Sequence, residues 1–323
     1  MATPVSSLPE AVEAARTGAI VVDRSALGML KFTGETRLDL IHRMSTQAVK
    51  DLASGEGAAT VLTSDIGRII DRLLLYASSG AVYALTGEGN AGNVARYLMG
   101  YVFFQDDFHV EDLSAETFIF AVYGAQAAGR LRPLFGEAVE LPVHHWRELK
   151  LVDRTVYLHR TDPVAGAGYF VMGDTEDREA VWARLVETGI APASEEAFEY
   201  LRIAEGLPRF GREITPDYIP LETGLWADVS FTKGCYTGQE VIARMESRGR
   251  LARKLVRLRA ADAVEPGTPI ELEGRAAGTI TSAAAGPEGV VALGYLKTRA
   301  LDESGAAPLT AGGVPLERVD EGG

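Results

Sequence analysis

The only cysteine of the chain, Cys235, lies in the segment Lys-Gly-Cys-Tyr-Thr-Gly-Gln-Glu that spans residues 233–240. Thr237 and Glu240 have the spacing of a capping box, which predicts a helix that begins just after the cysteine. A helix N-terminus and the nearby Lys233 both favour a thiolate over a thiol. The segment therefore predicts a reactive thiol, a nucleophile or a metal ligand; the alternative is a small buried hydrophobic residue in a tight turn.

Basic residues gather around this cysteine, although the whole chain has a net charge of −13. Between residues 233 and 254 they outnumber the acidic Glu240 and Glu246; they are Lys233, Arg244, Arg248, Arg250, Arg253 and Lys254. This local reversal of sign predicts an anion site, and phosphate, carboxylate and RNA stay open as the anion. The negative overall charge argues against general nucleic-acid binding.

The run Lys-Gly-Cys-Tyr-Thr-Gly-Gln-Glu-Val-Ile-Ala-Arg, residues 233–244, resembles the signature of the YgfZ group of folate-binding proteins. This group is related to the glycine-cleavage T-protein, an aminomethyltransferase. The resemblance implies that the chain binds tetrahydrofolate or a derivative and assists iron–sulfur cluster assembly or repair, with an indirect effect on tRNA modification. Iron–sulfur proteins or their assembly factors are the implied protein partners.

The same resemblance implies the site residues. Cys235 is the candidate reactive thiol, and Arg244 or Arg248 is expected to meet the glutamate tail of the folate through charge-assisted pairs. The full set expected to contact the cofactor is Leu74, Tyr76, Lys233, Gly234, Tyr236, Gly238, Gln239, Glu240, Arg244 and Arg248.

Two stretches depart from the T-protein pattern. A strand of the T-proteins carries two acidic residues, of which the second supports the transfer; here Asp71 matches the first and Arg72 replaces the second. A later glutamate of the T-proteins binds the pterin, but here Ala204 holds its place and the acid has moved to Glu205. These departures favour a binding protein over the alternative, a tetrahydrofolate-dependent aminomethyl- or methyltransferase. A structural adaptor without a ligand is the third hypothesis.

Composition narrows the class of protein. A chain of 323 residues with 46% hydrophobic and 24% charged residues is typical of a globular protein with two or three domains. The sequence shows no secretory signal and no apolar run of about 18–20 residues, so we expect a cytoplasmic protein that does not span a membrane. One cysteine and five scattered histidines predict no metal site.

Hydrophobic periodicity predicts alternating strands and helices, with strand-helix-strand-strand-helix units around residues 30–122 and 117–187. Helices are expected at 178–187 and 195–205, and residues 144–146, His-His-Trp, are expected to form a surface loop.

After Arg250 only β-type runs broken by Gly and Pro follow, with a glycine-rich loop expected at 305–313. The sequence thus predicts an α+β protein. Residues 1–245 are expected to form two ferredoxin-like lobes that bind folate, and residues 246–323 an antiparallel β-barrel. The resemblance implies that these lobes form a cloverleaf around a central ligand pocket.

Overall fold

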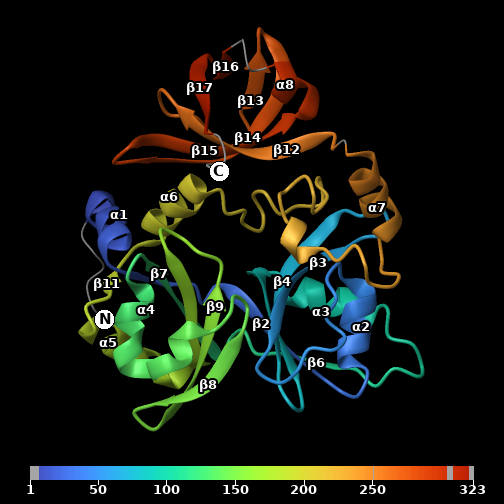
Figure 1. Cartoon of the computed structure of the whole chain (residues 1–323), viewed down its shortest axis with the longest axis vertical. Coiled ribbons are helices and arrows are strands. Elements are labelled where there is room, and N and C mark those ends of the chain that lie inside the picture. Colours follow the sequence, from blue (N-terminus) through green and yellow to red (C-terminus); the bar gives the residue numbers. More distant parts are fainter. Residues whose placement is uncertain (1–6, 250, 304–307, 320–323) are drawn as a thin grey trace.

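The computed structural model describes residues 7–249, 251–303 and 308–319. They form three lobes, with two α+β lobes side by side and a β-barrel against both (Figure 1). The expected α+β cloverleaf is therefore confirmed. Among the described helices, none is both long and apolar enough to cross a membrane.

The first lobe is an antiparallel sheet with strand order β3-β4-β5-β2-β6 and two helices on one face. Its elements are β2 (Leu27–Thr33), α2 (Arg37–Met44), β3 (Gly57–Thr63), β4 (Ile69–Ala77), β5 (Val82–Glu88), α3 (Ala91–Met99) and β6 (His109–Asp112). Side chains alternate along a strand, so Leu73 and Leu75 of β4 pack against α2 and α3. Leu74 and Tyr76 consequently point to the other face, toward the second lobe.

The second lobe is a six-stranded sheet with the order β11-β1-β7-β10-β9-β8, and α4 and α5 pack on its outer face. Its strands are β1 (Ile20–Asp23), β7 (Thr117–Gly124), β8 (Trp146–Leu151), β9 (Arg154–Thr161), β10 (Ala167–Asp174) and β11 (Ala191–Pro192). Its helices are α4 (Ala127–Phe135), α5 (Arg178–Glu187) and the 3₁₀ turns η1 (Gly136–Glu140) and η2 (Thr175–Asp177). The chain therefore contributes β1 to this lobe, then forms the first lobe, and continues in this lobe from β7.

Helices α1 (Leu8–Thr17) and α6 (Glu195–Glu205) lie between the second lobe and the barrel, and one hydrophobic cluster joins them to strand β15 of the barrel (Figure 1). Ser7 caps α1 by accepting a hydrogen bond from the Glu10 amide. The 3₁₀ turn η3 (Trp226–Asp228) and helix α7 (Gln239–Arg248) follow on the flank of the first lobe. The central interface is therefore closed by α6 and by the chain that follows it.

The barrel is closed, with the order β12-β15-β14-β13-β16-β17. Its elements are β12 (Arg253–Ala260), β13 (Pro269–Leu272), β14 (Arg275–Gly286), β15 (Gly289–Lys297), α8 (Thr298–Glu303), β16 (Leu309–Ala311) and β17 (Val314–Val319). The loop expected at 305–313 is wrong for its second half, because β16 and a Gly312-Gly313 turn form a hairpin with β17; residues 304–307 lie outside the described ones. A boundary at residue 246 falls within α7, and the domain division stays a prediction.

The expected surface loop at 144–146 is wrong for Trp146. This residue opens β8, is buried, and donates a hydrogen bond from Nε1 to the Ala77 carbonyl at 3.0 Å. Its ring packs between the two sheets against Tyr76 and Tyr83. A large aromatic side chain thus joins the two lobes where the sequence indicated an exposed turn.

Candidate functional site

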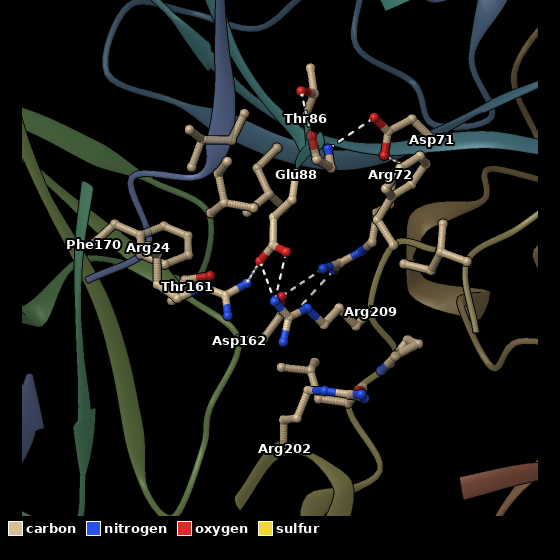
Figure 2. Close-up of a pocket in the computed structure, with 18 of the residues that line it drawn as sticks. Arg24, Asp71, Arg72, Thr86, Glu88, Thr161, Asp162, Phe170, Arg202 and Arg209 are labelled. Carbon is tan, nitrogen blue, oxygen red and sulfur yellow. Dashed lines mark hydrogen bonds and ion pairs between the residues drawn. The ribbon is translucent and has the colours of Figure 1, made fainter. Parts of the chain in front are cut away.

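A cavity of about 110 Å³ lies between the inner faces of the two α+β lobes, next to α6 (Figure 2). We call it the central cavity. Its walls combine apolar and aromatic side chains with charged ones. The apolar and aromatic members are Leu27, Leu74, Leu85, Tyr123, Phe170, Phe198, Leu207, Phe210 and Ile214. The charged members are Arg24, Asp71, Arg72, Glu88, Asp162, Arg202 and Arg209.

Arg72 is fixed by two carboxylates from different parts of the chain. Its Nη1 lies 2.7 Å from Asp162 Oδ2, in the turn between β9 and β10, and its Nε lies 2.6 Å from Asp228 Oδ2, in η3. A second contact to each carboxylate, at 3.3 and 3.5 Å, makes both pairs two-pronged. Arg72 therefore joins the first lobe to the second lobe and to the segment that precedes α7.

The neighbouring Asp71 also lines the cavity and is buried. Its carboxylate accepts hydrogen bonds from the amides of Arg72 and Gly87 and from Asn90 Nδ2, at 2.8 to 2.9 Å. Burial raises the pKa of Asp71 to about 6, against the lowering effect of these donors. Asp71 thus holds the end of β5 and the start of α3 in place.

Arg72 also controls the ionisation of Asp162. Burial alone would raise the pKa of this carboxyl, but the charge and hydrogen bonds of Arg72 outweigh it and lower the pKa to about 2. Because the pKa is lower in the folded than in the unfolded state, the ionised group stabilises the fold above the unfolded value of 3.8.

This stabilisation should disappear as the pH falls from about 4 to 2. We expect Asp162 to contribute about 2 kcal/mol that is lost across this window. Urea unfolding at a series of pH values measures it. Asp162→Asn should flatten the dependence between pH 4 and 2; an equally steep dependence in the variant would show that other carboxyls cause it.

A second set of ion pairs closes the end of the cavity nearest the barrel. The Glu88 carboxylate lies between two guanidinium groups, 2.7 Å from Arg24 Nη2 and 2.6 Å from Arg209 Nη2 (Figure 2). Arg24 also pairs with Glu195, and Arg209 with Glu199, both on α6. These pairs tie the first lobe to the second lobe and to α6.

Arg202 extends this set into the barrel. Its guanidinium is almost fully buried, pairs with Glu199 and Glu213, and donates to Ser282 Oγ at 2.8 Å. Every arginine that lines the central cavity thus already has a carboxylate partner. The cavity is also smaller than the roughly 300–1,000 Å³ of typical ligand pockets, so a ligand of folate size has to displace side chains or separate ion pairs.

The segment around Cys235 lies elsewhere, on the outer flank of the first lobe against α2 (Figure 1). The Thr237 amide donates to the Arg43 carbonyl, and the Thr237 carbonyl accepts from Thr63 Oγ1 at 2.7 Å. Cys235 is exposed, and it is not among the residues that line the central cavity. The structure therefore does not bring the thiol to the cavity wall.

The expected capping box is wrong. Helix α7 begins at Gln239 after Gly238, whose φ of 83° is left-handed, and the Thr237 hydroxyl contacts Met44 Sδ instead of an amide of the helix. Gly238 passes so close to the turn between β3 and β4 that a Cβ would lie 2.5 Å from the Ser64 carbonyl. Gly234, in contrast, has open space around it and no positive φ.

Lys233 does not face the thiol. Its ammonium donates to the carbonyls of His42, Ser45 and Gln47 at 2.5 to 3.0 Å, in the last turn of α2 and just after it. All three protons are used in this way, and burial lowers the pKa of Lys233 to about 8. Lys233 therefore anchors the segment on α2, and its ammonium is held by backbone carbonyls of that region.

The other expected contact residues divide into two groups. Tyr236 is buried in the small core under α7, where burial raises its pKa to about 12, and Gln239 is half-buried. Glu240 and Arg244 are exposed and pair with each other at 2.8 Å; the Arg248 side chain lies outside the described ones. Of the residues predicted to contact the cofactor, Leu74 lines the central cavity.

Comparison with known proteins places this geometry in a family. Residues 5–233 match the model of the GCVT N-terminal domain, and residues 253–320 match that of the CAF17 C-terminal β-barrel domain. The first match covers more than half of the chain. The chain belongs to the GCVT family.

Individual members agree with this assignment. An aminomethyltransferase of Symbiobacterium thermophilum is 30% identical over 92% of this chain and 83% of its own length. A chloroplastic protein of Arabidopsis thaliana, named as a candidate transferase, is 28% identical over 90% of this chain and 68% of its own length. The crystal structure of aminomethyltransferase T of Bartonella henselae shares the fold, with a TM-score of 0.85 at 21% identity over 98% of this chain and 88% of its own.

The sequence analysis did not identify several residues in and next to the central cavity. Glu88, Asp162 and Arg209 line the cavity, and Asp228 pairs with Arg72. These residues lie in four separate parts of the chain, and neither spacing nor local charge groups them. Glu205 is exposed at the end of α6, so the shifted acid does not face the cavity. Within the described residues, no cluster of His, Cys, Asp and Glu could hold a metal ion.

Proposed function

We propose that the chain binds tetrahydrofolate or a derivative and assists the assembly or repair of iron–sulfur clusters, with an indirect effect on tRNA modification, without transferring the one-carbon unit itself. The observation that carries the proposal is Arg72. It stands where the T-proteins place the acid that supports transfer, and Asp162 and Asp228 hold it there. The barrel of CAF17 type supports the link to iron–sulfur proteins.

Aromatic and apolar walls support folate as the ligand, because the flat pterin and benzoyl groups can pack against Phe170, Phe198 and Leu74. The glutamate tail needs cationic partners. Arg24 and Arg209 are better placed for this role than Arg244, because they line the cavity. In this proposal the carboxylates of the glutamate tail replace Glu88 as the partners of Arg24 and Arg209. The release of Glu88 opens the cavity.

The position of Cys235 supports a role toward a partner protein rather than toward the folate. The thiol is exposed, and Trp226 and Phe231, on the chain just before it, are 44% and 43% exposed. Their ring centroids lie 6.1 Å apart. Exposed aromatic pairs are typical of protein interfaces, so we propose that an iron–sulfur protein or assembly factor docks here, in the cytoplasm.

Folate-dependent transfer stays the second candidate, because the relatives named above carry transferase names and two carboxylates flank Arg72. An assay of one-carbon transfer from an aminomethyl donor to tetrahydrofolate separates the two candidates. We expect no turnover. Turnover that disappears when the central cavity is mutated would overturn the preference.

Binding itself is tested by titrating the protein with tetrahydrofolate and following intrinsic fluorescence. We expect a saturable response in the wild type that is lost in Leu74→Trp, because the larger ring fills the cavity. Leu74→Met conserves the volume and should bind as the wild type does. No saturable response in the wild type would favour an adaptor without a ligand.

A further inference from the structure

A second cavity lies between the same two sheets, at the end away from the barrel. It has a volume of about 190 Å³ and shares no described lining residue with the central cavity. Strand β4 contributes to both cavities, since Leu74 lines the central cavity and Tyr76, two residues further along the strand, lines the second. The Tyr76 hydroxyl lies 2.9 Å from Nδ1 of the buried His159.

Four aromatic rings line this second cavity: Tyr76, Tyr83, Trp146 and Tyr157. Trp146 is the centre of the group, with ring centroids 5.8 Å from Tyr157 and 6.4 Å from both Tyr76 and Tyr83. The planes meet Trp146 at 52 to 71°, so the rings form walls rather than a stack. We call this group the aromatic cage.

The aromatic cage presents mainly ring faces to a ligand, because two of its hydrogen-bonding groups already have partners in the protein. The Nε1 of Trp146 is used by the Ala77 carbonyl and the hydroxyl of Tyr76 by His159. The rest of the lining is largely apolar and includes Met29, Leu113 and Met172. Faces of Trp and Tyr attract cations through the ring quadrupole, most strongly where water is excluded.

The charged side chains around the second cavity favour a cation. Lys31 lines it but pairs with Glu111 at 3.0 Å. Asp174 also lines it, and within the described part of the chain its carboxylate has no hydrogen bond and no ion pair. Burial raises the pKa of Tyr157, and the charges of Glu148 and Asp174 act in the same direction, as expected for a negative surrounding.

We propose that the aromatic cage binds a small methylated ammonium cation, at a site separate from the central cavity and independent of its ligand. A few heavy atoms fit a volume of about 190 Å³, whereas ligands of drug size need roughly 300–1,000 Å³. The rings contact the methyl groups, and Asp174 supplies the counter-charge.

Choline and its neutral isostere 3,3-dimethylbutan-1-ol test this proposal, because they differ only in the charge of the central atom. Titration is followed by the fluorescence of Trp146 in the Trp182→Phe/Trp226→Phe protein, at constant ionic strength. We expect saturable binding of choline and about tenfold weaker binding of the isostere. Calorimetry on the wild type gives the same comparison without the tryptophan substitutions.

Three variants locate the site. Asp174→Asn should weaken choline about threefold and leave the isostere unchanged, and Tyr83→Leu should lose choline binding that Tyr83→Phe retains. Equal binding of choline and its isostere would show an apolar pocket without cation selectivity and overturn the proposal. So would the absence of a saturable response to choline.

Discussion

Replacing Arg72 by leucine is expected to lower the free energy of unfolding by about 3–5 kcal/mol. The reason is that Asp162 and Asp228 would then lie without a counter-charge, and Asp228 has a side-chain exposure of only 5%. Removal of one member of a buried ion pair costs far more than the pair itself contributes. Urea unfolding followed by circular dichroism measures the change.

Arg244→Leu is the matched control, because it removes an arginine from an exposed pair on α7. It should cost no more than about 0.5 kcal/mol. Combining Arg72→Leu with Asp228→Asn should recover part of the stability, since one of the two buried charges is removed with its partner. Equal costs for Arg72→Leu and Arg244→Leu would contradict the role of Arg72 as the link between the lobes.

Replacing Cys235 by serine is expected to abolish function in cells while leaving the fold and folate binding intact. The side chain is exposed and outside the central cavity, so the free energy of unfolding should change by no more than about 0.5 kcal/mol. Function is measured as the activity of iron–sulfur enzymes in cells that depend on this chain.

Thr232→Ser, a change at an exposed position in the same loop, is the control and should keep full function. If Cys235→Ser unfolds the protein, the thiol has a packing role. If the variant folds and supports full function, the thiol is not the reactive group and the proposed role of this loop is wrong.

Much of the fold could be predicted from the sequence, because local periodicity determines it. Helices α5 and α6 have the predicted limits, and both have an apolar face that packs on a sheet. Strands β8, β16 and β17 were missed, because β8 is a half-exposed edge strand and β16 is short and lies next to glycines. Their pairing depends on partners that local sequence does not specify.

The candidate site was less predictable. The sequence singled out Arg72 and Leu74, and the structure places both in the central cavity. The sequence also predicted that the charge of Lys233 acts on the thiol. In the structure the Lys233 ammonium donates hydrogen bonds to three backbone carbonyls of the first lobe. Contacts between residues far apart in the chain, such as Glu88 with Arg209, depend on how the lobes pack and leave no local signal.

A crystal structure of the chain with tetrahydrofolate tests the central claim most directly. We predict the pterin between Phe170 and Leu74 in the central cavity, Glu88 separated from Arg24 and Arg209, and Cys235 on the outer flank, away from the ligand. A folate bound elsewhere, or a central cavity that keeps its ion pairs and stays empty at saturating ligand, would contradict this account.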